Sequence, residues 1–490
     1  MNKIYTQGMS FVDEHGRARI FNGANICSKN HNSDVASHTV FPYDLDDEFF
    51  QRYVSAGFNL IRLGVCWEEL EPEMGVYNET FLKSVDEIFR RAEKWDVYIY
   101  LDMHQDLYGS FGKGLGDGAP KWAYLSEPYE PKPAKFVWAE GYFWGKAVHR
   151  AFDNFWDNKD IACRGVQDRF ADVWKMLAAR YKDCPALLGY DFLNEPFPGK
   201  SGGKVFRKLI MSLTKNILFN PKISAFGMLG DLIHKDRRDQ LLDHLHGGVI
   251  GDITKAADKL IGEFDRERYS PFLRRVANAV REETDNGIAI FEHCYYSNLG
   301  IPLSVDPIEV NGKREKLQCY SPHGYDFTVD TPAYKFANNS RIKAFFDPAR
   351  ETQKRLNVPV IAGEWGGGGE GTGWFPHVRF LLDLFDSYQW SQTYWAFTPF
   401  TDDALLGELN RPYPVAVTGE IGGYALDREN RVFTLEYTQN EPVEAETVVY
   451  VPGAPAAVEC GGEVLLTEEN GADFIKIKTQ PGKHKIVIRL

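Results

Sequence analysis

Short runs of apolar residues alternate along most of the chain with longer segments in which apolar side chains recur every three or four positions. The short runs are rich in β-branched and aromatic residues, as is typical of strands buried on both faces of a parallel sheet. The longer segments, such as Glu79–Trp95 and Val166–Asp183, have the spacing of amphipathic helices. The runs predicted as strands are Ala18–Asn25, Phe58–Val65, Val97–His104, Ala186–Leu193, Gly287–Glu292, Leu317–His323, Pro359–Glu364 and Gln392–Phe397.

Strands that alternate with helices in this way predict an α/β fold, and eight of them predict a closed (β/α)8 TIM barrel. An open, doubly wound sheet is the alternative, but no GxGxxG motif follows an early strand. Polar side chains stand at the carboxyl ends of most of the runs. In a barrel of this kind that end carries the active site, so we expect these side chains to converge there.

The pattern changes after residue 405. Short alternating runs separated by turn signals fill Arg411–Leu490 and predict an antiparallel β-sandwich. We expect a barrel domain over residues 1–405 and a C-terminal β-sandwich over residues 406–490. The stretch from Pro198 to Asn286 is longer than a barrel connection needs, so we expect a mainly helical insertion near residues 200–265. Its apolar, locally basic first part either covers the barrel or forms a lid or lipid-facing surface.

Charge and cysteine usage narrow the classes of partner and compartment. The net charge of −13 argues against nucleic acid, because phosphate contacts need a basic surface. The 7 cysteines are scattered without metal-ligand spacing and favour a reducing compartment over a disulfide framework. The N-terminus has no signal-peptide core, and no apolar stretch reaches the ~20 residues of a membrane span. We expect a cytoplasmic protein as the sequence stands, or a secreted one if a leader has been removed, and no protein partner.

Two glutamates close buried runs at similar places. Glu195 follows ALLGYDFLN, Glu364 follows PVIAG, and each precedes a turn. Burying a carboxyl group at such a position costs free energy unless the group is paired or serves a function. Retaining glycoside hydrolysis requires two carboxyl groups ~5–5.5 Å apart, one to attack the anomeric carbon and one to protonate the leaving oxygen. The pair predicts that chemistry, which needs no metal and no cofactor, and the neighbouring Asn194 can donate to a sugar 2-hydroxyl.

Other strand-end residues can support this pair. Arg62 can hold Glu364 ionised by charge pairing, and Tyr325 can donate a hydrogen bond to it. His323 can orient a hydroxyl group or the acid, and Trp395 can stack on a sugar ring. The alternative for Arg62 is a structural ion pair within the barrel. The alternative for His323 and Trp395 is packing in the barrel core.

Several motifs in this chain resemble those of one known family. The segments LDMHQDLYG, GDGAPKWA, RAFDNFW, YDFLNEPF, SPHGYD, IAGEWG and a late RPYP before the sandwich resemble glycoside hydrolase family 5, and within it the endoglycoceramidases and glucosylceramidase-like enzymes. The resemblance covers essentially the whole chain. It implies that Glu195 is the acid/base and Glu364 the nucleophile. It places these further residues in or beside the sugar site: Lys29, His104, Asp106, Asn194, His323, Tyr325 and Trp395.

The resemblance also implies a substrate. We expect hydrolysis of the β-glycosidic bond between a glycan and a lipid aglycone such as ceramide, with a glycolipid as partner and transient contact with a membrane or micelle surface. A β-glucosidase or β-glycanase acting on soluble or plant-derived glycosides is the alternative, and a non-catalytic carbohydrate-binding barrel is a third hypothesis. The apolar insertion favours the lipid. The sequence does not distinguish glucose from galactose or a longer glycan as the sugar, or exo from endo cleavage.

Overall fold

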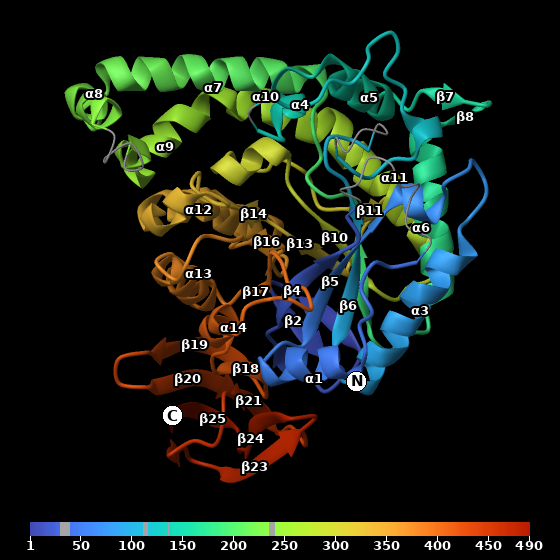
Figure 1. Ribbon diagram of the computed structural model, residues 1–490. Helices are drawn as coiled ribbons and strands as arrows, with labels where there is room; N and C mark the ends of the chain where they lie inside the picture. The colour runs from blue at the N-terminus through green and yellow to red at the C-terminus, as the bar shows by residue number, and fades with distance from the viewer. Residues whose placement is uncertain (30–39, 111–115, 136, 235–240) are drawn as a thin grey trace.

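Eight parallel strands form the centre of the computed structural model, which describes residues 1–29, 40–110, 116–135, 137–234 and 241–490 (Figure 1). Their order around the sheet is β13-β10-β9-β6-β5-β4-β17-β15, and a parallel bridge from Tyr320 to Val360 joins the two outer strands. The sheet therefore closes into the predicted barrel. The strands are β4 (Asn22–Cys27), β5 (Leu60–Cys66), β6 (Tyr98–His104), β9 (Leu187–Asp191), β10 (Ile288–Phe291), β13 (Gln318–Tyr320), β15 (Ile361–Ala362) and β17 (Ser391–Tyr394).

Amphipathic helices cover the outside of the barrel. In α3 (Glu79–Lys94) the side chain of Asn78 accepts a hydrogen bond from the backbone N–H of Phe81 and caps the helix. The apolar residues of α3 recur at helical spacing, and that face is buried. The other covering helices are α1 (Asp47–Ser55), α6 (Val166–Tyr181), α11 (Ser270–Arg281), α12 (Asn339–Leu356) and α13 (Phe375–Tyr388).

Two of the predicted strands are interrupted near their carboxyl ends. The run 317–323 divides into β13 and β14 (His323–Gly324), and the run 359–364 divides into β15 and β16 (Glu364–Trp365). The short strands β14 and β16 pair in parallel, with His323 directly opposite Glu364. The interruption thus places an imidazole beside a carboxylate at the mouth of the barrel.

Two antiparallel sheets form the C-terminal domain, as predicted. The larger has the order β1-β2-β3-β18-β21-β24-β23 and the smaller β19-β20-β25-β22. Their C-terminal strands are β18 (Tyr413–Val417), β19 (Glu420–Asp427), β20 (Val432–Gln439), β21 (Thr447–Val451), β22 (Ala457–Glu459), β23 (Glu463–Glu469), β24 (Ala472–Lys478) and β25 (Gly482–Arg489).

The N-terminal residues correct one expectation. β1 (Ile4–Gln7), β2 (Ser10–Asp13) and β3 (Ala18–Arg19), which we assigned to the barrel domain, belong to the larger C-terminal sheet, where β3 pairs with β18. The first barrel strand therefore begins at Asn22 and not at Ala18. The apolar run continues from β3 into β4 with little interruption, so its periodicity does not mark the change of sheet.

Helices α7 (Lys200–Phe219), α8 (Ala225–Ile233), α9 (Gly247–Thr254) and α10 (Asp258–Phe264) form most of the long segment between β9 and β10. They lie on the side of the barrel remote from the C-terminal sheets (Figure 1). Arg341 of α12 ties the segment to the barrel, because its guanidinium donates to the backbone carbonyl of Leu245 at 3.1 Å and pairs with Asp326 at 2.8 Å. Among the described residues, no helix is long and apolar enough to cross a bilayer.

Candidate active site

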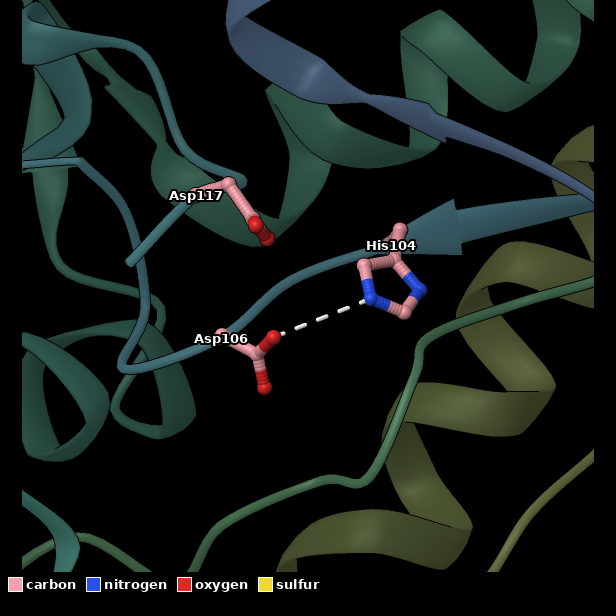
Figure 2. Close-up of side chains that lie close together, drawn as sticks. All are labelled: His104, Asp106 and Asp117. Atoms are coloured by element: carbon pink, nitrogen blue, oxygen red, sulfur yellow. Dashed lines mark ion pairs between the residues drawn. The ribbon is translucent and has the colours of Figure 1, made fainter. Parts of the chain in front are cut away.

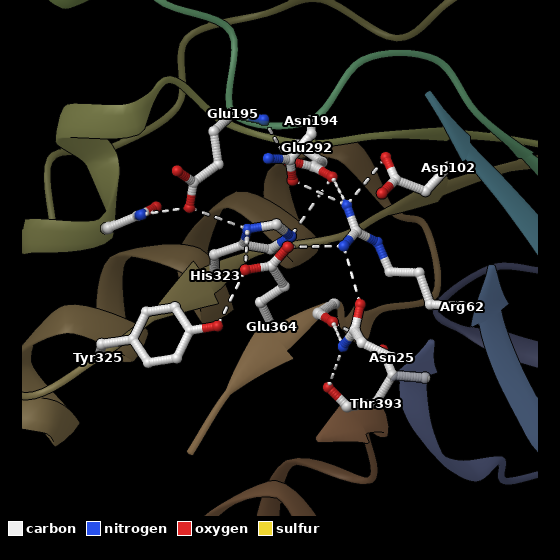
Figure 3. Close-up of polar contacts among 12 residues, drawn as sticks. Asn25, Arg62, Asp102, Asn194, Glu195, Glu292, His323, Tyr325, Glu364 and Thr393 are labelled. Carbon is white, nitrogen blue, oxygen red and sulfur yellow. Dashed lines mark hydrogen bonds and ion pairs between the residues drawn. The ribbon is translucent and has the colours of Figure 1, made fainter. Parts of the chain in front are cut away.

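Glu195 and Glu364 approach each other at the carboxyl ends of the barrel strands (Figure 3). One carboxylate oxygen from each and a ring nitrogen of His323 all lie within 4.8 Å of one another. That spacing is close to the ~5–5.5 Å of retaining glycosidases and well below the ~6.5–9.5 Å of inverting ones. The two carboxyl groups can therefore perform a double displacement.

The surroundings of Glu364 favour its ionised form. Arg62 Nη1 donates to Oε1 at 2.6 Å, and the Tyr325 hydroxyl donates to Oε2 at 2.9 Å. Burial alone raises the pKa of Glu364, but the positive charges of His323 and Arg62 outweigh it and leave that pKa below its ordinary value. Glu364 is thus held as a carboxylate, which is the form needed for attack.

The surroundings of Glu195 have the opposite effect. Burial raises the pKa of Glu195, the negative charge of Glu364 raises it further, and the contact with His323 offsets only part of this. Asn298 Nδ2 donates to Oε1 at 2.6 Å, and His323 Nδ1 lies 3.1 Å from the same oxygen. Two neighbouring carboxyl groups whose pKa values are pushed apart can divide the roles of acid and nucleophile.

The backbone holds Glu195 in a rare conformation. Its φ of 40° lies in the left-handed region, which costs a residue with a side chain of order 1 kcal/mol or more. The backbone N–H of Glu195 donates to Glu292 Oε2 at 2.6 Å. Gln105 Nε2 donates to the carbonyl oxygens of Asn194 and Glu195 at 2.9 and 3.2 Å. These bonds fix the turn that aims the Glu195 carboxyl at Glu364.

His323 is a buried cation between three carboxylates. Burial lowers its pKa, but Glu292 and Glu364 raise it to about 10. His323 Nε2 lies 3.3 Å from Glu292 Oε1, and Nδ1 lies 3.8 Å from Glu364 Oε2. In turn the charges of His323 and Arg62 outweigh burial and hold the pKa of Glu292 at about 2. The imidazolium therefore contacts the carboxyl groups of Glu195, Glu364 and Glu292 at once.

Arg62 is the second buried cation of the site. Its guanidinium donates to Asn194 Oδ1 at 2.9 Å and to Glu292 Oε1 at 2.6 Å. It also pairs with Asp102 at 3.1 Å and with Asp191 at 3.2 Å. Since the side chain is fully buried, these contacts replace the water that the charge would otherwise need.

Four predicted residues remain, and they lie close to one another: Lys29, His104, Asp106 and Trp395. Lys29 pairs with Asp106, and its Nζ lies 4.5 Å from the centroid of the Trp395 ring. The His104 ring stacks on Trp395 with 5.5 Å between centroids and 14° between planes. Figure 2 shows His104 Nε2, which lies 3.8 Å from Asp106 Oδ2. This wall combines an indole face with charged donors and acceptors, as a sugar-binding surface requires.

Within the described part of the chain, three groups of side chains have spacing suited to a metal ion: His104 with Asp106 and Asp117, Glu195 with His323 and Glu364, and Asp102 with Asp191 and Glu292. A protein cation is already present at each group: Lys29 pairs with Asp106 in the first, Arg62 pairs with Glu292 in the third, and His323 is itself the cation of the second. A divalent ion would therefore meet positive charge as well as ligands.

A cavity of about 710 Å³ extends from the carboxyl pair. Lys29, His104, Asp106, Asn194, Glu195, Tyr325, Glu364 and Trp395 all line it. Arg62 and His323 lie behind this lining. Arg62 contacts Glu364, and His323 contacts both glutamates. The other lining is mainly apolar and includes Trp138, Phe143, Phe206, Leu209, Ile210, Leu213, Leu245, Ile250, Ile253 and Phe327.

The polar residues of the site that were not singled out from the sequence include Asp102, Asp191, Glu292 and Asn298. Asp102, Asp191 and Glu292 interrupt or end apolar runs, and that signal could have identified them. Asn298 lies in the 3-10 helix η5 (Tyr295–Leu299), beyond the end of β10, where no strand-end rule applies. Its contact with Glu195 depends on how that loop folds back over the barrel.

Comparison with known families gives two matches that together span most of the chain. The model for Cellulase (glycosyl hydrolase family 5) matches residues 21–218 and 253–401. The model for the glycoside hydrolase family 5 C-terminal domain matches residues 411–488. The gap in the first match contains α8 and most of α9.

Individual relatives agree with these matches. Endoglycoceramidase I of Rhodococcus hoagii (strain 103S) is 30% identical over 495 residues, which cover 97% of this chain and 85% of that protein. An endoglycoceramidase of Cyanea nozakii is 34% identical over 220 residues, or 40% of this chain and only 42% of that relative. The solved structure of endo-glycoceramidase II from Rhodococcus sp. shares the fold, with a TM-score of 0.74, 21% identity and 99% of each chain covered. This chain belongs to glycosyl hydrolase family 5.

Proposed function

We propose that this chain is a retaining β-glycosidase that releases a glycan from a lipid aglycone such as ceramide. The observation that carries the proposal is that one cavity is lined by the carboxyl pair with its polar neighbours and, over the remainder, mainly by apolar side chains. Leu209 and Leu213 of α7 and Ile250 of α9 line that remainder. Burial of hydrocarbon against them is favourable by roughly 25 cal/mol per Å². The two relatives named endoglycoceramidase support the same substrate class.

In the first step Glu364 attacks the anomeric carbon while Glu195 gives its proton to the leaving oxygen. The product of this step is a glycosyl ester on Glu364. Because esterification removes the negative charge of Glu364, the repulsion that raises the pKa of Glu195 disappears. Glu195 then acts as the base that activates water, and hydrolysis of the ester restores the original configuration.

The polar wall beside the pair is proposed to bind the sugar. Trp395 offers an indole face for stacking, and Lys29 with Asp106 offers a donor and an acceptor for hydroxyl groups. His104 is held by a 2.7 Å contact between its Nδ1 and Asp102 Oδ2, which leaves Nε2 toward Asp106. Asn194 Nδ2 donates to the carbonyl of Gln105 at 3.0 Å, and its second hydrogen can reach a sugar 2-hydroxyl.

The test compares lipid-linked and soluble substrates. Glucosylceramide, lactosylceramide, a ganglioside, a cello-oligosaccharide and an aryl β-glucoside are incubated in parallel, and the products are identified by mass spectrometry. Leu213→Lys, in the apolar wall, should lower kcat/KM on the lipid substrates at least ~10-fold, because it places a charge where hydrocarbon binds. Leu260→Lys is the control, since Leu260 is also half-buried but lies outside the cavity lining.

Each outcome bears on a different part of the proposal. Turnover of the cello-oligosaccharide without turnover of any ceramide glycoside would make the lipid assignment wrong and favour a soluble-glycoside enzyme. Equal losses in Leu213→Lys on lipid and aryl substrates would also contradict it. If no glycoside is cleaved, or Glu364→Ala behaves like wild type, the hydrolase mechanism itself is wrong.

A further inference from the structure

The outer face of α7 carries lysines and large apolar side chains in one row. Lys204, Lys208, Met211, Lys215 and Leu218 are spaced by three or four residues, so they share a helix face, and all five are exposed. Met211 is 66% and Leu218 63% exposed. The opposite face of α7 holds the buried residues Val205 and Leu209. A helix with two apolar faces, one of them bordered by lysines, is unusual for a surface that meets only water.

The apolar face continues to Phe219, the last residue of α7, and along α8. Phe219 is 76% and Phe226 90% exposed, and Leu229 and Ile233 follow with 52% and 65% exposure. All nine residues of α8 are at least partly exposed, although the helix is strongly apolar. Figure 1 shows α8 at the outer end of α7, at the edge of the molecule. Exposed apolar surface on this scale marks an interaction site.

The charge of this segment is opposite to that of the whole chain. Residues 200–233 contain five lysines, one arginine and a single acid, Asp231, for a net charge of +5, whereas the chain as a whole carries −13. Lysine stems can lie along an apolar surface while their ammonium groups reach an anionic layer. The combination of exposed Phe and Leu with flanking lysines is typical of helices that lie in the interface of an anionic membrane.

The same patch adjoins the cavity. Phe206, Ile210 and Leu213 of α7 line the cavity, one turn or less from Met211 and Lys208 on the outer face. Beside α7, Trp144 packs edge-on against Phe206 with 5.8 Å between ring centroids and is itself 56% exposed. Tryptophan at such a rim suits the boundary between lipid headgroups and acyl chains.

We propose that the outer face of α7 together with α8 docks the protein onto an anionic lipid surface, with the mouth of the cavity beside the bilayer. The occupant is a lipid surface and not a soluble acidic protein, because the apolar residues that carry the patch protrude on a helix and do not line a groove. Docking requires no glycolipid and so can be tested apart from catalysis.

The test measures binding of the full chain to vesicles that contain no glycolipid. One set is phosphatidylcholine alone and the other contains phosphatidylserine, and bound protein is separated by flotation at low and high salt. Wild type should bind the anionic vesicles, and the binding should weaken with salt. Each lysine contributes roughly a fivefold change in partitioning, so Lys204→Gln, Lys208→Gln and Lys215→Gln combined should reduce binding on the order of 100-fold.

A second variant tests the apolar part. Phe219→Ser with Phe226→Ser should also lose binding to the anionic vesicles, because these rings would enter the acyl region. The matched control is Leu465→Ser with Leu466→Ser, which alters exposed apolar residues on β23, at the other end of the molecule. Lys83→Gln, Lys313→Gln and Lys478→Gln combined are the control for charge, since all three lysines are exposed elsewhere.

Two results would overturn the proposal. One is that wild type fails to float with anionic vesicles at low salt, or floats equally well in the α7 and α8 variants and in the controls. The other is that wild type forms a dimer in solution that Phe219→Ser with Phe226→Ser dissociates, which would show that a second copy covers this face. Aryl-glycoside turnover should be unchanged in the variants and reports that they remain folded.

Discussion

Replacement of His323 by glutamine tests the electrostatic account of the carboxyl pair. Glutamine keeps a side-chain donor near Glu195 but removes the positive charge that lies 3.8 Å from Glu364 Oε2 and 3.1 Å from Glu195 Oε1. The charge is fixed at neutral pH because the neighbouring carboxylates raise the pKa of His323 to about 10. The substitution therefore changes the charge of the site by one unit across the whole working range.

The expected size of the effect follows from Coulomb's law. Unit charges ~4 Å apart interact by about 4 kcal/mol at an effective dielectric constant near 20, which corresponds to an upper bound of about 3 pKa units. Arg62 remains 2.6 Å from Glu364 and still favours its ionised form. We therefore expect the pKa of Glu364 to rise by about 1–2 units. Since Glu364 must be ionised to attack, the acid limb of kcat/KM should move to higher pH by that amount.

The assay is the pH dependence of kcat/KM on an aryl β-glycoside that wild type cleaves. His293→Gln is the matched control: burial and the charge of His323 lower the pKa of His293 to about 3, so its replacement removes an imidazole but no charge. The control should keep the acid limb of wild type even if its rate falls. An unmoved acid limb in His323→Gln, or equal shifts in both variants, would refute the idea that the His323 cation holds Glu364 ionised.

Two further substitutions test the groups around the nucleophile. Arg62→Met leaves four buried acidic side chains without their shared cation and should destabilise the fold by about 3–5 kcal/mol in urea unfolding near neutral pH. Arg164→Met, which breaks an exposed pair with Asp172, should have a much smaller effect. Because Arg62 holds the pKa values of Glu292 and Glu364 low, the loss should shrink as the pH falls and those groups become protonated; a loss independent of pH would contradict this. Tyr325→Phe removes the donor 2.9 Å from Glu364 Oε2, and since a hydrogen bond to a charged group contributes about 1.5–3 kcal/mol, kcat/KM should fall by roughly 10–100-fold. An unchanged kcat/KM in Tyr325→Phe would show that this hydroxyl does not support the nucleophile.

The barrel and the carboxyl pair were predictable because both leave a local mark in the sequence. Buried parallel strands are short and apolar, and a glutamate that ends such a strand stands out by its cost. Glu195 and Glu364 satisfy both conditions, and the closure of the sheet brings them together. By contrast, the role of Asn298 comes from a loop contact between residues 103 positions apart, which no local pattern specifies.

The difference in pKa between the two glutamates could not be predicted from the sequence either. His323 and Glu364 become neighbours through the pairing of β14 with β16, two short strands that the sequence presents as parts of longer runs. The sheet to which the three N-terminal strands belong was not predicted for a related reason, since β3 joins it through β18, which lies almost 400 residues away. The apolar helices of the insertion were expected, but only the structure shows which faces line the cavity and which are exposed.

The central claim is that Glu364 forms a covalent bond to the sugar. A 2-deoxy-2-fluoro aryl β-glycoside should inactivate the protein, since the fluorine destabilises the transition state and lets the glycosyl-enzyme accumulate. Peptide mapping by mass spectrometry should then find the added mass of one fluorosugar on the peptide that contains Glu364, and Glu364→Gln should prevent the labelling. A label on Glu195 or elsewhere, or hydrolysis that proceeds with inversion and leaves the protein unlabelled, would contradict the account.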